Sequence, residues 1–329
     1  MSATREIKER IDSVNNTLKI TNAMYMISST KMNNARKALA NTEPYFYALQ
    51  DMFGRVLRHL PDGYSHPYLD EREVASKSDL RRAIICVTAD KGLAGAYNHN
   101  VLKLTEEKLR PAKNDMLYVV GEVGRQYFAN HNVNVDGAFH YTAQKPTLSR
   151  ARSIAYQMLD LFERKEVDEV FIIYTRMKNS METETEIRQL LPLIRLNEEF
   201  FKQNMTKLTG VFQETFEMEP GPDLLLNNII PDYINGYIYS ALVESYCAEH
   251  SSRMQAMDAA NKNGSELVQE LSIQYNRERQ AQITQEITEV CAGAKARALQ
   301  QKKHKKKNMP KFENQQGEDL DTFQAGALH

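Results

Sequence analysis

The sequence predicts a fold of the α/β class, in which a Rossmann-like α/β domain is inserted between two terminal helices that form a long antiparallel coiled coil. The first observation is an apolar repeat, with steps of four and three residues, in the first sixty residues. The second is an alternation of strand-like and helix-like segments through the middle of the chain. The third is a stretch from Asp232 to about Gln300 that contains no proline. Together these observations predict the order helix, α/β domain, helix.

The first predicted element is a helix over residues 4–58. One face carries a seam of mainly apolar residues, whose middle positions are polar or small. The seam positions are Ile7, Ile11, Val14, Leu18, Thr21, Tyr25, Ser28, Met32, Ala35 and Leu39. At 1.5 Å per residue this helix is roughly 80 Å long, too long for the inside of a compact domain. Pro44 removes one backbone hydrogen bond and is expected to bend it.

The middle of the chain, residues 80–215, is expected to form the α/β domain. Runs of β-branched and aromatic residues predict strands at 81–88, 116–121, 133–139 and 168–175, with further candidate strands at 183–193 and 207–215. Helices are predicted between the strands, at 98–110, 122–131 and 147–165. This alternation favours parallel βαβ units in a small three-layer domain.

Helix is predicted again after the sequence EPGPD at 219–223. Pro222 and Pro231 each stand where a helix can begin, and each is followed by an aspartate in the first turn. A helix from Asp232 to about Gln300 would be roughly 100 Å long. The coiled-coil shaft is therefore expected to be one discontinuous domain of residues 1–60 and 222–300. The remaining tail, 301–329, is basic and then acidic without periodicity, and is expected to be disordered.

Composition gives no indication of a nucleic-acid-binding, membrane-spanning or disulfide-stabilised protein. Lys+Arg total 42 against 43 Asp+Glu, so the overall charge gives no argument for a nucleic-acid partner. The longest apolar runs are short, such as VFIIY at 170–174, and fall far below the roughly 20 residues that span a bilayer. Three widely spaced cysteines suggest neither a disulfide framework nor a zinc site. The N-terminus has no apolar signal core and carries three carboxylates, so we expect a protein of a reducing, cytosolic compartment.

The sequence contains no recognisable catalytic constellation. The most tempting motif is TADKGLAGAYN at 88–98, which follows the first strand of the α/β unit. Its glycines, Gly92 and Gly95, do not have the spacing of a dinucleotide-binding or P-loop motif. The histidines form no ligand pair at helical spacing beside a carboxylate, and the serines lack a nucleophile-elbow context. We therefore expect no catalytic residues, no cofactor and no metal.

Several segments together resemble one family, the gamma subunits of bacterial F-type ATP synthases. NTLKITNAMYMISSTKM at 16–32 is similar to the family's N-terminal motif K-I-T-x-A-M-x-M-x-x-x-x-K. ITQEITEVCAGAKA at 283–296 resembles its C-terminal signature I-T-x-E-x-x-[DE]-x-x-x-G-A, and the segments 251–271 and 275–286 resemble its neighbouring region. The loop at 88–98 is similar to the family's loop after the first strand. The resemblance extends over about residues 1–298.

The resemblance implies a rotating central stalk with one copy per complex and no bond chemistry of its own. Its implied partners are the ring of alpha and beta subunits, the epsilon subunit and the membrane c-ring, through which proton flow turns the shaft. The implied location is peripheral, on the cytoplasmic face of the bacterial inner membrane. The implied rotor–stator contacts fall into three sets: Arg279, Gln280, Thr284 and Glu286 at a catch loop of a catalytic subunit, Met24 and Arg253 near the beta-subunit lever, and Asp90 and Lys91 under the ring.

Two other classes of function are compatible with parts of the sequence. An enzyme that uses the Rossmann-like domain would bind nucleotide saturably, and millimolar nucleotide would raise its melting temperature. A coiled-coil adaptor, recruiting through the basic run KKHKKK at 302–307, would bind partners other than alpha and beta subunits and would tolerate charge reversal at Arg279.

Overall fold

The computed structural model describes residues 3–61, 63–69, 72, 79–110, 115–179, 182–193, 218–219 and 221–307. The chain forms two compact units. One unit combines Met1–Val14 with Leu267–His329, and the other is Asn15–Glu266. The predicted strand at 207–215 and residues 308–329 of the predicted tail lie outside the described residues.

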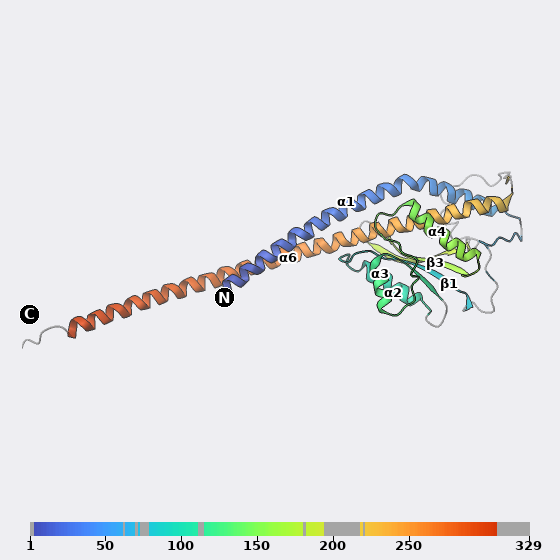
Figure 1. The fold of residues 1–329 in the computed structure, drawn as a ribbon. Helices are drawn as coiled ribbons and strands as arrows, with labels where there is room; N and C mark the ends of the chain where they lie inside the picture. Colours follow the sequence, from blue (N-terminus) through green and yellow to red (C-terminus); the bar gives the residue numbers. More distant parts are fainter. Residues whose placement is uncertain are drawn as a thin grey trace, which may run out of the picture. The chain divides into compact units, whose positions relative to one another are not determined.

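Each terminal segment forms a single long helix (Figure 1). Helix α1 is Ala3–Arg58 and continues through Pro44, while α6 is Pro222–Lys307 and continues through Pro231. Helix α6 thus ends beyond Gln300, where the sequence had led us to expect its end. No glycine or proline lies between Gln300 and Lys307, so nothing in that segment stops a helix.

The seam predicted on α1 faces inward along its whole length. All ten predicted positions, from Ile7 to Leu39, are buried or half-buried. Within the unit Asn15–Glu266, residues of α1 meet residues of α6 in reverse order: Leu18 with Gly264, Thr21 with Asn261, Phe46 with Gly236 and Phe53 with Tyr233. The two helices are therefore antiparallel in this unit. In the other unit, Thr4 Oγ1 donates to Gln282 Oε1 at 3.1 Å.

A four-stranded mixed sheet forms the centre of the α/β part. Its strands stand in the order β2-β1-β3-β4, with the bounds β1 Arg82–Val87, β2 Met116–Val120, β3 Glu169–Met177 and β4 Thr183–Leu191. Strand β1 pairs in parallel with both β2 and β3, whereas β4 is antiparallel to β3. The intervening helices are α2 Tyr97–Lys108, α3 Glu122–Asn130 and α4 Leu148–Glu163. Parallel βαβ connectivity is confirmed for β1, β2 and β3.

The strand predicted at 133–139 is wrong. Only an isolated bridge joins Val135 to Leu117 in β2. The side chain of Asp136 accepts hydrogen bonds from the backbone N–H groups of Ala138 at 2.9 Å and Phe139 at 2.8 Å. Such local bonds, made by aspartate beside a glycine, favour a turn over a strand.

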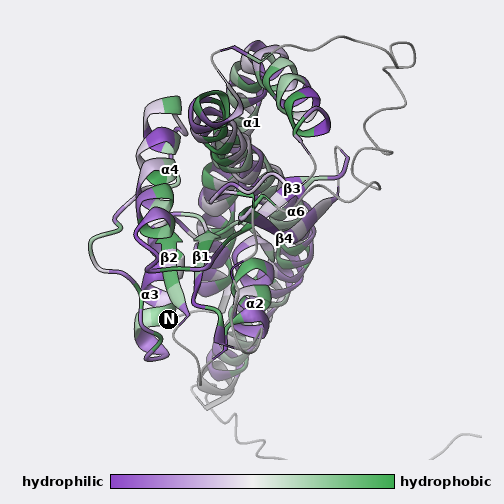
Figure 2. Ribbon diagram, turned by 90° about the vertical axis from the view of Figure 1, so that its right-hand side faces the viewer, coloured by the Kyte–Doolittle hydropathy of each residue, from purple (hydrophilic) through white to green (hydrophobic). Residues whose placement is uncertain are grey.

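The sheet is covered on both faces. Alternate residues of β1, such as Ile85 and Val87, belong to a core cluster shared with α4, α1 and α6. The residues between them, Ile84 and Cys86, pack in a second cluster with α2 and α3. Figure 2 shows strands β1 and β2 as mainly hydrophobic between these helices. The parallel strands, buried on both faces, explain why their sequences read as continuous apolar runs.

Gly236 allows α1 to approach α6 closely. A Cβ atom built at this position would lie 2.2 Å from Phe46 Cδ1. We expect Gly236→Ala to lower the free energy of unfolding by about 1–3 kcal/mol, because overpacking outweighs the gain in helix propensity. Urea denaturation followed by circular dichroism measures the change.

Gly293 in the same helix provides the matched control. A Cβ there meets no atom within 4 Å. Gly293→Ala should therefore stabilise the helix by up to about 1 kcal/mol through propensity alone. Stabilisation by both substitutions would contradict the close approach of Phe46.

Candidate functional site

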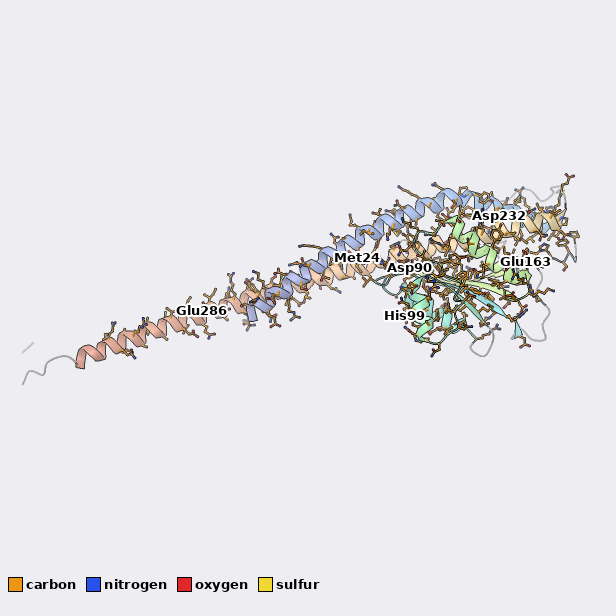
Figure 3. All side chains as sticks on the ribbon, viewed as in Figure 1. Met24, Asp90, His99, Glu163, Asp232 and Glu286 are labelled. Carbon is orange, nitrogen blue, oxygen red and sulfur yellow. The ribbon has the colours of Figure 1, made fainter. Side chains whose placement is uncertain are left out.

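Four of the eight predicted contact residues line one cleft. Met24 from α1, Asp90 and Lys91 from the loop after β1, and Arg253 from α6 border a cavity of about 300 Å³ in the unit Asn15–Glu266. Figure 3 labels Met24 and Asp90 on these neighbouring elements. We call this space the loop cleft. Residues more than 160 positions apart in sequence thus meet in one place, with Arg253 Nη2 bonded to the Lys91 carbonyl.

Arg253 fastens the loop after β1 to α6. Its Nη1 donates to Glu249 Oε1 at 2.6 Å and also lies 3.2 Å from His250 Nδ1. Its Nη2 donates to the backbone carbonyls of Lys91 at 3.1 Å and Gly92 at 3.0 Å. Only 6% of the residue is exposed. The guanidinium group therefore makes its hydrogen bonds inside the protein.

Burial sets the protonation of the groups around Arg253. Since a guanidinium only donates, His250 Nδ1 is the acceptor and the imidazole is neutral. Burial, followed by the positive charges of Arg253 and Lys31, lowers the pKa of His250 from 6.5 to about 3. Burial also raises the pKa of Glu249 above its ordinary value, against the opposing effect of Arg253. These two residues were not among the predicted site residues, although the i,i+4 pairing of Glu249 with Arg253 is visible in the sequence.

Asp90 also uses its carboxylate inside the protein. Oδ1 accepts from the backbone N–H groups of Glu122 at 3.1 Å and Ala143 at 3.2 Å. Oδ2 accepts from the N–H of Gln144 at 3.2 Å and from the hydroxyl of Thr142. Glu122 is the first residue of α3, where the helix dipole favours a negative charge. Asp90 thereby fixes the loop against α3.

The outer side of the loop cleft is accessible. Lys91 is exposed, and Leu93, two residues further on, is 65% exposed with a φ of 62°. Ile27 on α1, which also lines the cleft, is 55% exposed. An ammonium group and two apolar side chains are thus presented outward, while Asp90 and Arg253 hold the loop from within.

The other four predicted residues lie on α6 in the unit that combines Met1–Val14 with Leu267–His329, and all are exposed: Arg279, Gln280, Thr284 and Glu286. The Thr284 hydroxyl donates to the Gln280 carbonyl at 2.9 Å within the helix. Every residue from 281 to 302 is exposed. This part of α6 therefore presents hydrogen-bonding side chains on all its faces.

The described residues include no group of three or more His, Cys, Asp or Glu side chains that could hold a metal ion. Among those same residues, no helix has the length and apolar character needed to cross a membrane. The candidate site presents Lys91 beside the exposed apolar side chains of Leu93 and Ile27, and the exposed polar segment of α6.

Known proteins match nearly the whole chain. The family model described as ATP synthase matches residues 3–297. The ATP synthase gamma chain of Ruminiclostridium cellulolyticum is 41% identical over 293 residues, which cover 89% of this chain and 98% of that relative. The gamma chain of Caldanaerobacter subterraneus subsp. tengcongensis is 41% identical over 300 residues, which cover 88% of this chain and 98% of that one.

Solved structures share the fold. A chain in the structure of the Euglena gracilis mitochondrial ATP synthase, comprising OSCP, F1 and c-ring, aligns with a TM-score of 0.61 and 17% identity. The alignment covers 95% of this chain and 99% of that one. At this identity the likeness concerns the fold, a parallel-sheet core with a long C-terminal helix. Because the family model and both relatives extend over nearly the full length, the chain belongs to the ATP synthase gamma chain family.

Proposed function

We propose that this chain is the rotating central stalk of an F-type ATP synthase. One copy couples ion flow through the membrane c-ring to ATP synthesis, or to hydrolysis in reverse, at the catalytic sites of an alpha/beta ring. The chain performs no bond chemistry itself, and an epsilon subunit joins it in the stalk. The complex lies at the cytoplasmic face of the bacterial inner membrane, with this chain peripheral to the bilayer. The observation that carries the proposal is membership of the gamma chain family, with the family model matching residues 3–297.

The shaft of this rotor is an antiparallel coiled coil of residues 1–60 and 222–300, with the Rossmann-like domain of residues 80–215 inserted between its two halves. Burial of the seam from Ile7 to Leu39 and the reversed order of α1–α6 contacts support this arrangement. The polar centre of the seam, with Thr21 bonded to Asn261, gives the helices a fixed register.

The exposed part of α6 suits a shaft that turns inside a ring. Contacts with the ring must break as rotation proceeds. A few hundred Å² of fixed apolar burial would cost several kcal/mol to release, at ~25 cal/mol per Å². Exposed ion pairs, at roughly 0–1 kcal/mol each, exchange more easily. A helix with hydrogen-bonding groups on all faces and few apolar ones meets that requirement.

We assign the individual contacts as follows. Arg279, Gln280, Thr284 and Glu286 engage a catch loop of one catalytic subunit, since all four are exposed on α6. Met24 contacts the lever region of a beta subunit, and Lys91 contacts the underside of the ring. Asp90 and Arg253 act as positioning residues for these contacts, because both hold the loop that carries Lys91.

Co-expression with cognate alpha and beta subunits tests the proposal. We expect a purified complex that contains one copy of this chain and hydrolyses ATP. The double change Arg279→Ala/Gln280→Ala should lower turnover by about tenfold, the effect of losing roughly 1.4 kcal/mol of interaction at the rate-limiting contact. Arg152→Ala, an exposed arginine on α4, is the control and should leave turnover unchanged.

Failure to form a complex would reject the rotor function. A complex that forms but turns over normally with the double change would reject the catch-loop assignment alone.

A further inference from the structure

A second cleft lies between α1 and α6 in the unit Asn15–Glu266, and the proposed function does not use it. We call it the aromatic cleft; its volume is about 230 Å³. Four aromatic rings and two carboxylates line it: Phe46, Tyr47, Tyr233, Tyr237, Glu43 and Glu244. We propose that this cleft receives the guanidinium group of an arginine presented by a partner polypeptide.

The aromatic rings form walls of a kind that bind organic cations. The Phe46 ring lies directly on the backbone of α6 at Gly236, where there is no side chain to separate them. On the α6 side, Tyr233 is stacked on Phe53 with 5.1 Å between ring centroids, which fixes its orientation. A guanidinium group stacks on such rings by cation–π attraction, worth about 0.5–2 kcal/mol depending on desolvation.

The carboxylates supply charge for such a cation. Within the part of the chain that the structure describes, no ion pair joins Glu43 or Glu244 to a lysine or arginine. The charged groups that face Glu244 from neighbouring elements are Glu43 on α1, Glu186 on β4 and Arg176 on β3. Arg176 is already engaged, with Glu184 at 3.0 Å and Glu186 at 3.3 Å. Arg188 is engaged as well, with Glu186 at 2.9 Å. These two arginines stand against four carboxylates, Glu43, Glu184, Glu186 and Glu244. The surroundings of Glu244 therefore carry excess negative charge.

Glu244 is a half-buried carboxyl with a raised pKa. Burial, followed by repulsion from Glu186, raises the pKa of Glu244 to about 7. An opposite charge within about 4–6 Å favours the ionised form of a carboxyl and so lowers its pKa. Binding of a cation should therefore be coupled to loss of a proton from Glu244.

The size and rim of the cleft favour a side chain of a polypeptide. Sites for drug-sized ligands usually measure about 300–1,000 Å³, and this cleft is smaller. At its edge, Tyr47 is 64% exposed, and the neighbouring Tyr45 is 58% exposed. A partner chain would cover these rings, whereas a small free cation would leave them in water. Tyrosine at the rim and arginine at the centre are also the residue types enriched in protein interfaces.

The chemistry of the cleft is tested on the full chain with methyl-labelled leucine. Leu39 and Leu49 line the cleft, so their methyl resonances report binding. The probe is N-acetyl-L-argininamide, and the matched neutral probe is N-acetyl-L-citrullinamide. We expect only the arginine probe to shift these resonances. Its affinity should be about tenfold higher at pH 8 than at pH 6, following deprotonation of Glu244. Equal shifts with the citrulline probe would overturn the proposal.

Two variants make this experiment specific. Glu244→Gln should abolish both the affinity and its pH dependence, while Glu266→Gln, an exposed carboxylate elsewhere on α6, should change neither. The glutamine side chain has the same shape as that of Glu244. Because burial already favours the neutral form of Glu244, the variant is expected to fold. Unchanged binding to Glu244→Gln would contradict the role of this carboxylate.

Hydroxyl-radical footprinting tests the polypeptide occupant. Tyr47 should react in the free chain and be protected in the complex with alpha, beta, epsilon and c subunits. Tyr156 on α4, which is 61% exposed, is compared in the same samples as the reference. Equal reactivity of Tyr47 in the free chain and in the complex would overturn a polypeptide occupant. Failure of the complex to assemble would instead contradict the proposed function, while the titration still decides whether the cleft binds the cation.

Discussion

Replacing Arg253 by methionine should lower the free energy of unfolding by about 3–5 kcal/mol, the usual cost of removing one partner of a buried ion pair. The side chains of Arg253 and Glu249 are each only 8% exposed. Without the guanidinium, Glu249 remains as a buried carboxyl that has lost its ion-pair partner, with only the weaker influence of Lys31 to offset its charge. The carbonyls of Lys91 and Gly92 also lose their donor. Chemical denaturation at pH 7 measures the loss.

A double-mutant cycle separates the ion pair from the packing of the arginine stem. Glu249→Gln removes the negative charge and keeps the shape of the side chain. We expect Arg253→Met/Glu249→Gln to be at least about 1 kcal/mol more stable than the sum of the two single changes predicts. Each single variant leaves one charge of the pair buried without its partner, whereas the double variant leaves neither. Strict additivity would show that Arg253 acts mainly through packing or through the loop carbonyls.

The same variant distinguishes a positioning role from direct contact with the ring. If Arg253 acts by holding the loop, the Arg253→Met complex should lose coupling together with protection of the loop against proteolysis. Arg253→Lys restores the positive charge but not the fork that reaches two carbonyls at once. A complex in which Lys fully restores coupling would favour direct electrostatic contact with the beta subunit.

Much of this architecture could be predicted from the sequence because it depends on periodicity. The seam from Ile7 to Leu39 has the helical period, and its positions are the inward ones in the structure. Strands β1 to β3 are continuous apolar runs, and the helices between them begin and end within two residues of expectation. The periodicity within one segment is enough to predict the secondary structure of such elements.

The roles of single polar residues could not be predicted in this way. Asp90 and Arg253 were expected to face partner subunits. Within the chain they hydrogen-bond to the backbone of Ala143 and of Lys91, which are far away in the sequence. The aromatic cleft was missed for the same reason, because Glu43 and Glu244 meet only when α1 lies beside α6. A single sequence carries no signal for such pairs beyond their residue types.

His250 should make the protein less stable in mild acid, by about 2 kcal/mol at pH 5 relative to pH 7. Its pKa is about 3 in the folded state and 6.5 as the ordinary value. A group whose pKa is lower in the folded protein than in the unfolded chain stabilises the fold fully at pH values above its unfolded-state pKa. This stabilisation is lost as the pH falls toward the folded-state pKa. Below about pH 6.5, His250 is therefore protonated in the unfolded chain but stays neutral in the folded protein. The buried neutral imidazole, an acceptor for Arg253, is the physical origin.

The pH dependence of the unfolding free energy of the wild-type protein will not by itself reveal the effect of His250, because the contribution of Glu244 changes with pH in the opposite direction. Its pKa is raised from 4.5 to about 7, so its contribution is complete below pH 4.5 and is lost as the pH rises through 7. Between pH 5 and 6.5 the two residues partly cancel. The informative quantity is the difference in unfolding free energy between wild type and His250→Gln, measured from pH 5 to pH 7. That difference should shrink by about 2 kcal/mol toward pH 5, while a difference independent of pH would mean that the imidazole is protonated, or reaches water, in the folded state.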